Sequence, residues 1–244
     1  MCLGSSRDRF PFPRLVGVRR SSWLYGTADS QASYEFVVFA PRRFCERLTG
    51  LAFLLTRRSV SNEILGKISK AVRDGKKPNL ENANNYKEIE ASLEKLPILT
   101  HQSIDGGPYI SSAMAVAYDE EYGRNLSFHR AMKIDNQHLV LRILDRHLMD
   151  YMKRGLKEFA YCNGVSVPVL LGAATSFGIE EDEMAVANAL ADSPVIELAG
   201  HTIPQSEVVM ICEFTGEMHD EGPFVDLTDT PDIIRQQHVV KIKR

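Results

Sequence analysis

Three segments with the composition of β-strands follow one another between residues 109 and 144, separated only by short turns. Residues 109–118 alternate large and small apolar side chains, and residues 119–123 have the composition of a hairpin turn. Residues 125–134 and 138–144 continue the pattern. Consecutive strands joined in this way favour an antiparallel sheet or barrel over a doubly wound parallel sheet. We therefore expect an α+β fold with flanking helices.

Apolar periodicity predicts further elements around these strands. Residues 86–96 have the spacing of a short amphipathic helix that ends at Pro97. Asp145 is suited to cap a second helix. The apolar side of that helix would be Leu148, Met152, Leu156 and Phe159. Further helices are expected at 168–175 and 183–190, and further strands at 195–198, 207–214 and 238–242.

Composition divides the chain into three parts. Residues 1–33 are rich in Arg, Ser, Gly and Pro, and we expect an irregular N-terminal segment there. Residues 34–84 are expected to form a partial α/β region and a linker, and residues 85–244 the main domain. The middle part contains, in order, a strand at 34–40, helical pieces between 42 and 72, and a polar linker at 76–84.

Bulk properties argue against several classes of partner. A net charge of −3 gives no reason to expect nucleic acid or an anionic membrane surface. No apolar run approaches the roughly 20 residues that span a bilayer, and the start lacks the apolar stretch of a signal peptide. The cysteines form no CxxC pair and are expected to be reduced thiols. We therefore expect a cytoplasmic protein.

Arg130 is an unusual choice for its expected strand, because large apolar residues such as Phe128 and Met132 share its face. An unpaired buried cation is very costly, so a partner is expected. Glu221 and Asp226 are the candidates, since they flank a Gly-Pro turn that brings two carboxylates close together. The alternatives are that Arg130 reaches water at a barrel rim and that the turn is simply solvated.

Asn125, His147 and Glu183 together could bind one hard divalent cation. Amide and carboxylate oxygens suit Mg²⁺ or Mn²⁺, and an imidazole shifts the preference toward Mn²⁺. Each residue also has a structural alternative. Asn125 can close the preceding turn, His147 can lie on a solvated helix face, and Glu183 can be a first-turn helix acid. From residue type alone, both interpretations stay open.

Five motifs stand in a fixed order along the chain. They are Leu96-Pro-Ile-Leu-Thr100, Gly107-Pro-Tyr-Ile110, Arg124-Asn125 through Arg130, Asp182-Glu183 and Glu221-Gly-Pro-Phe224. Together they resemble the UbiD family of prenylated-FMN-dependent decarboxylases over about residues 93–243. The residues of these motifs are most similar to those of the archaeal branch, the anhydromevalonate phosphate decarboxylases. The resemblance implies an antiparallel split β-barrel of the flavin-reductase type.

The resemblance also implies roles for individual residues. Arg130, Glu221 and Asp226 would form a proton-transfer network, with Asp226 as proton donor and acceptor. Asn125 and Glu183 would bind Mn²⁺ or Mg²⁺, with His147 as a third ligand, and the ion would bridge to the cofactor phosphate. K⁺ is a further candidate ion. The cofactor-contacting residues would be Phe128, His129, Arg130, Arg142, Ile143, Leu144, Arg146 and His147.

The implied reaction is non-oxidative decarboxylation of an α,β-unsaturated acid. In the archaeal branch the acid is trans-anhydromevalonate 5-phosphate, and the products are isopentenyl phosphate and CO₂. An aromatic acid of the 4-hydroxybenzoate type is the alternative substrate within the family. A truncated fragment that only binds flavin and metal, or a plain FMN oxidoreductase on a similar barrel, are the alternatives outside it.

Two protein partners are also implied. A flavin prenyltransferase would supply the prenylated FMN. Family members are usually longer than this chain, with a C-terminal domain that drives oligomerisation. We therefore expect a homo-oligomer where that domain is supplied.

Overall fold

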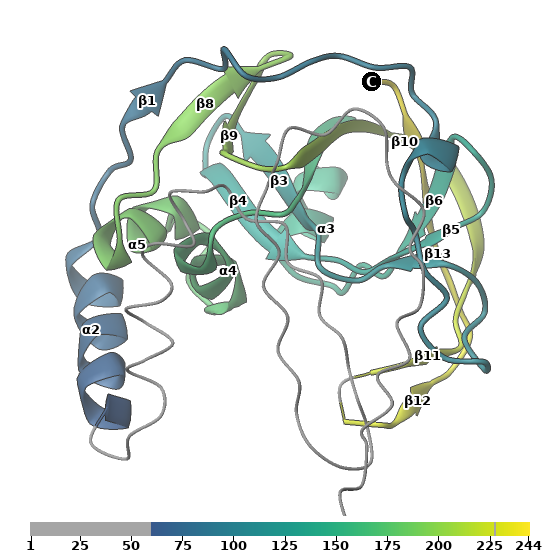
Figure 1. Ribbon diagram of the computed structural model, residues 1–244, viewed down its shortest axis with the longest axis horizontal. Coiled ribbons are helices and arrows are strands. Elements are labelled where there is room, and N and C mark those ends of the chain that lie inside the picture. The colour runs from purple at the N-terminus through teal and green to yellow at the C-terminus, as the bar shows by residue number, and fades with distance from the viewer. Residues whose placement is uncertain (1–59, 227) are drawn as a thin grey trace, which may run out of the picture.

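The computed structural model describes residues 60–226 and 228–244 (Figure 1). Its main feature is an eight-stranded sheet in the order β2-β5-β6-β13-β10-β7-β3-β4, with every neighbouring pair antiparallel. The sheet curls into a half-barrel (Figure 1), which confirms the expected α+β class and antiparallel split barrel. Its strands are β2 (Tyr109–Ile110), β3 (Met114–Asp119), β4 (Gly123–Phe128), β5 (Ala131–Lys133), β6 (His138–Leu141), β7 (Glu158–Asn163), β10 (Val208–Glu221) and β13 (Arg235–Ile242).

Helices lie beside the β3–β4 edge of this sheet (Figure 1). Gly172 allows two of them, α4 and α5, to approach closely, because a Cβ there would stand 2.6 Å from the carbonyl oxygen of Glu183. That contact places the first residue of α5 against α4. The helices are α2 (Val60–Asp74), α3 (His147–Lys153), α4 (Val167–Ala174) and α5 (Glu183–Leu190), with a 3-10 turn η1 (Leu93–Lys95).

Two smaller sheets complete the described part of the chain. The first has the order β1-β8-β9 and the second pairs β11 with β12. The residues expected to form a polar linker contribute β1, which runs parallel to β8. The strands are β1 (Leu80–Glu81), β8 (Val195–Leu198), β9 (His201–Pro204), β11 (Phe224–Val225) and β12 (Pro231–Asp232).

Strand β3 is buried on both faces, which explains its alternation of large and small side chains. The small residues Ala115 and Ala117 belong to the cluster inside the barrel, together with Phe159 and Tyr161. On the opposite face, Met114 packs in the cluster that includes residues of α4 and α5. Successive strand residues point to opposite faces, so one strand serves both cores.

The expected single strand at 125–134 is wrong. The chain leaves β4 at Phe128 and enters β5 at Ala131, and these two strands lie far apart in the sheet order. His129 and Arg130 occupy the break. Arg130 therefore does not share a strand face with Phe128 and Met132, although its need for a partner holds.

Two expected helices also differ from the structure. Only η1 forms within 86–96, because Tyr86 ties the chain to the β9–β10 connection, exchanging hydrogen bonds with the backbone of Ser206. The helix expected after Asp145 ends at Lys153. Gly155 follows in the left-handed region (φ 105°), and Phe159 then belongs to β7, a strand the periodicity did not reveal.

Three other expected elements are present in the structure. The helix at 183–190 and the strand at 195–198 are confirmed at their bounds, and the hairpin turn at 119–123 joins β3 to β4. The irregular segment 1–33 and the strand at 34–40 lie outside the described residues. Within the described part of the chain, the helices are all too short or too polar to cross a bilayer.

Candidate active site

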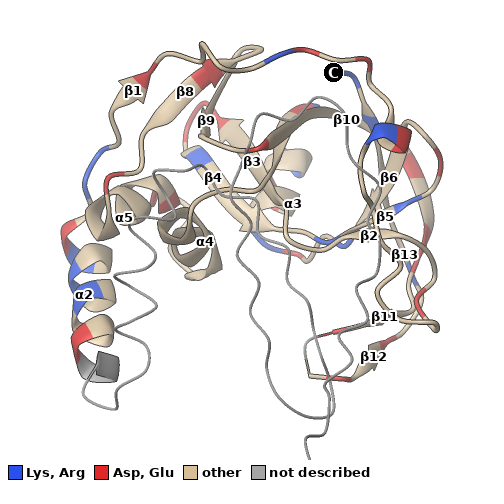
Figure 2. Ribbon diagram, viewed as in Figure 1, with Lys and Arg blue, Asp and Glu red and all other residues tan. Residues whose placement is uncertain are grey.

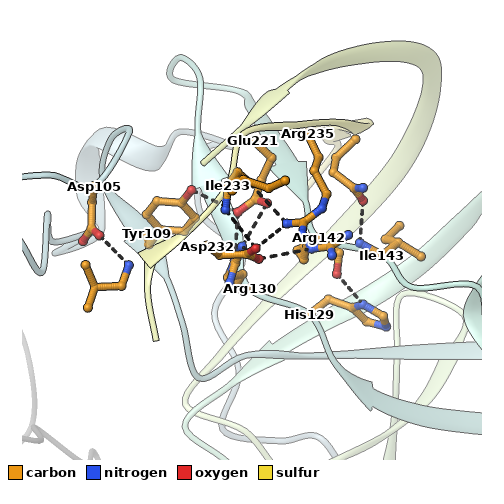
Figure 3. A network of polar contacts seen from close by, with 12 residues as sticks. Asp105, Tyr109, His129, Arg130, Arg142, Ile143, Glu221, Asp232, Ile233 and Arg235 are labelled. Carbon is orange, nitrogen blue, oxygen red and sulfur yellow. Dashed lines mark hydrogen bonds and ion pairs between the residues drawn. The ribbon is translucent and has the colours of Figure 1, made fainter. Parts of the chain in front are cut away.

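Arg130 and Glu221 form a buried ion pair at the end of the barrel (Figure 3). Nε of Arg130 donates to Oε1 of Glu221 at 2.8 Å, and Nη2 donates to Oε2 at 3.1 Å. The Glu221 side chain is 0% exposed. Tyr109 donates a third hydrogen bond to Oε1 at 3.0 Å. Such a fully bonded pair tolerates burial, whereas removing one partner of a buried pair typically costs about 3–5 kcal/mol.

The aromatic ring of Phe224 packs against the guanidinium of Arg130. The Phe224 ring centroid lies 4.6 Å from Cζ of Arg130 and 4.5 Å from the Tyr109 ring centroid. The pKa of Tyr109 is raised far above its usual value, first by burial and then by the negative charge of Glu221. Tyr109 therefore stays protonated and acts as a hydrogen-bond donor.

Asp232 provides the second acid of the Arg130 network. Nη2 of Arg130 donates to its Oδ2 at 2.8 Å, and Arg235 donates to its Oδ1. Nε of Arg142 lies 3.7 Å from Oδ2. Hydrogen bonds from Arg235 and then Arg130 hold the pKa of Asp232 well below its usual range. The carboxylate is therefore charged at neutral pH.

Asp226, the expected second acid, lies elsewhere in this structure. Its exposed carboxylate accepts from the backbone N and the hydroxyl of Thr228, at 2.8 and 2.5 Å. The bonds from Thr228 lower its pKa. The structure thus brings together Arg130 and Glu221 as expected, but Asp232 makes the contact with Arg130 that was expected of Asp226.

The turn that carries Glu221 packs against the glycine turn that precedes β2. Gly106 N donates to the carbonyl oxygen of Pro223 at 2.7 Å, and a Cβ on Gly106 would stand 2.2 Å from the carbonyl oxygen of Gly222. Only glycine permits this approach. The two motifs that contain these turns are therefore neighbours in space.

The three residues expected to bind a metal also meet, from β4, α3 and α5. Nδ2 of Asn125 lies 3.0 Å from Oε1 of Glu183 and 3.4 Å from Nδ1 of His147. Asn125 and Glu183 are each 3% exposed. Burial raises the pKa of Glu183 to about 7. In residues 60–226 and 228–244 no three His, Cys, Asp or Glu side chains form a metal-binding group, so this cluster depends on its amide.

Neighbouring pairs fix the position of Glu183. Asp182 caps α5 by accepting from Met184 N at 2.9 Å, and Arg124 donates to both of its carboxylate oxygens. Leu126 N donates to the second oxygen of Glu183 at 2.9 Å. Both Arg124 and Asp182 come directly before the expected ligands in sequence, although their part in positioning them was not foreseen.

The hydrogen-bond chain beyond Asn125 determines which way its amide faces a cation. Nδ1 of His129 must donate to the carbonyl oxygen of Arg142 at 3.0 Å, and burial lowers the pKa of His129, so Nε2 accepts. Ser127 lies 2.9 Å from that nitrogen and has one proton to give. The structure places Oδ1 of Asn125 3.1 Å from the Ser127 oxygen as an acceptor, so giving the Ser127 proton to His129 requires the amide to turn over. A half-turn of the amide satisfies this count and points Oδ1 at Glu183 and His147.

The residues expected to contact a cofactor lie around the same break between β4 and β5. Arg142 N donates to the carbonyl oxygen of Arg130 at 3.0 Å, so the segments 128–130 and 142–144 run side by side. Phe128 and Leu144 are exposed apolar side chains, whereas Ile143 is buried. Arg146 and His147 stand at the start of α3. Phe128 and Leu144 thus leave apolar side chains exposed beside the segment that leads from Asn125 to Arg130.

The half-barrel and its helices are those of UbiD-class enzymes. An evolved dimeric form of the UbiD-class enzyme HmfF from Pelotomaculum thermopropionicum, in complex with prFMN, has a TM-score of 0.66 at 28% identity, covering 73% of this chain and 46% of that one. The vanillic acid decarboxylase of Sedimentibacter hydroxybenzoicus in closed form has a TM-score of 0.67 at 21% identity, covering 77% and 44%. At that identity the likeness shows the fold alone.

The chain belongs to the UbiD family. Residues 70–244 match the family model of the 3-octaprenyl-4-hydroxybenzoate carboxy-lyase Rift-related domain. The anhydromevalonate phosphate decarboxylase of Methanothermobacter thermautotrophicus is 37% identical over 175 residues, 66% of this chain and 41% of the relative. That of Methanocaldococcus jannaschii is 39% identical over 166 residues, 64% and 39%. The chain therefore spans about two fifths of the length of these relatives.

Proposed function

We propose that this chain decarboxylates an α,β-unsaturated carboxylic acid with prenylated FMN, converting trans-anhydromevalonate 5-phosphate into isopentenyl phosphate and CO₂. The observation that carries the proposal is the position of two sites at the two ends of one segment. Arg130, which pairs with the buried Glu221, lies just after the end of β4. Asn125 lies within β4, where Glu183 and His147 reach it from two helices. The names of the relatives at 37% and 39% identity support the choice of substrate.

The donor set at Asn125 fits a hard divalent cation. With Oδ1 of the amide turned inward, two oxygen donors and one imidazole face one another at hydrogen-bond distances. Three acceptors at that spacing repel unless a cation or protons lie between them. Tyr151, on the same helix as His147, has a buried hydroxyl with no hydrogen-bond partner among the described residues. These residues would hold Mn²⁺ or Mg²⁺ against the flavin phosphate.

The flavin would lie along the segment that leads from Asn125 to Arg130. Phe128, His129, Arg142, Ile143, Leu144 and Arg146 are the residues we expect to contact it. When bound, prenylated FMN supplies the electron sink that the carbanion equivalent needs after CO₂ leaves. The chain orients the unsaturated acid over that sink and returns a proton to the carbon.

The proton would be handled by Arg130 and its acids. Arg130 compensates the negative charge of Glu221, which is otherwise strongly disfavoured by burial. Asp226 remains our proton donor because of its place in the motif Glu221-Gly-Pro-Phe-Val-Asp226. Its carboxylate accepts from Thr228, so these bonds must break before Asp226 delivers a proton.

The test is to express the chain together with a flavin prenyltransferase and purify it with Mn²⁺. Bound prenylated flavin, identified by absorbance and mass spectrometry, together with isopentenyl phosphate formed from trans-anhydromevalonate 5-phosphate, supports the proposal. Glu221→Gln is the control, since it keeps the size of the side chain and removes its charge. Size-exclusion chromatography of the loaded protein tests the homo-oligomer that belongs to the same proposal.

Three results would contradict the proposal in different ways. Turnover of 4-hydroxybenzoate but not of the phosphorylated acid would move the chain to the aromatic acid decarboxylases. Binding of plain FMN with oxidation of a nicotinamide would make it an oxidoreductase. Bound flavin and metal without CO₂ release from either acid would identify a non-catalytic binding fragment.

A further inference from the structure

We propose that Asp232 is a positioning residue, which holds the guanidinium of Arg130 in place beside Glu221. The importance of this arginine position for catalysis rests on the proposed function, whereas the hydrogen bond between Asp232 and Arg130 does not. The resemblance gives the second acid of this network to Asp226. In the resting site, Asp232 of the same β11–β12 hairpin makes the contact with Arg130.

The guanidinium of Arg130 is held from two directions (Figure 3). Glu221 accepts from Nε and Nη2 at 2.8 and 3.1 Å, and Asp232 accepts from Nη2 at 2.8 Å. The nitrogen Nη2 is therefore shared by two carboxylates. Charge-assisted bonds from two acids fix both the plane of the group and its rotation, which a single acid does less strictly.

Asp232 also balances the charge of three arginines. Its carboxylate accepts from Arg130 and Arg235, and Nε of Arg142 lies 3.7 Å away. Without Asp232 these three cations would keep only Glu221 as a directly bonded acid. At a partly buried site the repulsion among them is weakly screened, so Arg130 would lose its fixed position.

The β11–β12 hairpin brings Asp232 to this position as part of a fixed unit. Phe224 in β11 pairs with Asp232 in β12, and the Phe224 ring lies 4.6 Å from Cζ of Arg130. Val225 N donates to Oδ1 of Asp105 at 2.9 Å, which attaches the hairpin to the loop before β2. The ring and the carboxylate therefore reach Arg130 together.

Asp226 stands at the other end of the same hairpin turn. Its carboxylate oxygen Oδ1 accepts from the backbone N and the hydroxyl of Thr228. Asp232 meanwhile accepts from Nη2 of Arg130, Arg235 and the backbone N of Ile233. In the resting site Glu221 and Asp232 occupy both protons of Nη2, and Asp226 can bond to this nitrogen only by displacing one of them.

The contact can be tested without cofactor or substrate. Nitrogen-15 NMR of arginine-labelled protein reports how fast the guanidinium protons of Arg130 exchange with water, with the signal assigned from Arg130→Lys. We expect Asp232→Asn to speed this exchange by about tenfold or more, the scale of a lost hydrogen bond to a charged group. Asp232→Glu should restore much of the protection. Unchanged exchange in Asp232→Asn would overturn the proposal.

Asp226→Asn is the matched control, because it makes the same change of carboxylate to amide on the same hairpin. It should leave the exchange of Arg130 unchanged, and an acceleration equal to that of Asp232→Asn would overturn the proposal even if the latter variant folded poorly. In the loaded enzyme, Asp232→Asn should lower kcat at least tenfold with little change in KM. Faster exchange with unchanged kcat would refute the role in the reaction. Absence of decarboxylation in the unmodified chain would refute only the proposed function.

Discussion

Tyr109 and Glu221 are 112 residues apart in the chain and joined by a 3.0 Å hydrogen bond inside the protein. The phenol donates to Oε1, the same oxygen that accepts from Nε of Arg130. Tyr109 lies in β2 at one edge of the half-barrel, whereas Glu221 ends the long strand β10 in its middle. This bond therefore attaches the edge of the barrel to the buried acid.

Tyr109→Phe should destabilise the protein by about 1–3 kcal/mol, because it removes a donor to a buried carboxylate and leaves the aromatic packing in place. Urea denaturation followed by circular dichroism measures the change. Tyr118→Phe is the matched control, since Tyr118 is 65% exposed and should change stability by less than about 0.5 kcal/mol. Equal effects of the two substitutions would show that the phenol contributes nothing to Glu221.

The close packing of α4 against α5 positions Glu183, and substitutions at two helical glycines test this packing. Gly172→Ala should be strongly destabilising, because the new Cβ would stand 2.6 Å from the carbonyl oxygen of Glu183. Gly66→Ala in α2 meets nothing within 4 Å and should raise stability by about 0.5–1 kcal/mol. Thermal unfolding of both variants measures the contrast. Similar stabilities would mean that α4 does not press on α5 as described.

Stability should also depend on pH through His129. Burial lowers its folded-state pKa below the unfolded value of about 6.5, so the unfolded state takes up a proton first as the pH falls. The contribution is therefore complete above pH about 6.5 and is lost as the pH falls toward the folded pKa. Urea denaturation at stepped pH between 7.5 and 5.5 should show the stability of the unmodified protein falling relative to that of His129→Gln as the pH decreases, because the opposite contribution of Glu183, whose pKa is raised to about 7, is present in both. The exposed His219→Gln is the control, and an equal relative change there would remove His129 as the source.

The local sequence pattern was sufficient to predict the bounds of elements whose two ends are marked by particular residues. The helix at Glu183–Leu190 starts at a capping Asp182, and its bounds were predicted correctly. The expected helix that ran to Phe159 was wrong because Gly155 ends it early, and a conformation with positive φ is not visible in apolar spacing. The strand expected through Arg130 was wrong because the break sends β4 and β5 to different parts of the sheet.

In the candidate site too, local sequence predicted one contact, whereas another depends on how distant segments pair. The cost of burying a cation made Glu221 a candidate partner of Arg130, with exposure at a barrel rim as the alternative, and Glu221 is its partner in the structure. The second acid could not be chosen in this way. Asp226 and Asp232 are both close to Glu221 in sequence, and only the pairing of β11 with β12 decides which of them reaches the guanidinium.

The orientation of the Asn125 amide gives the last prediction, which concerns the cation. When Ser127 gives its proton to His129, its oxygen can only accept, so the amide of Asn125 must turn its NH₂ toward Ser127 and its oxygen toward Glu183. Ser127→Ala should therefore weaken Mn²⁺ binding by on the order of tenfold to a hundredfold, the usual effect of removing a residue that orients a metal ligand. Electron paramagnetic resonance of free Mn²⁺, titrated into the protein in the presence of FMN, measures the affinity. Ser112→Ala makes the same change at an exposed position and should leave it unaltered. If Ser127→Ala binds Mn²⁺ as well as the unmodified chain does, the amide is not oriented by this hydrogen-bond chain, and the fit of the cluster to a cation loses its main support.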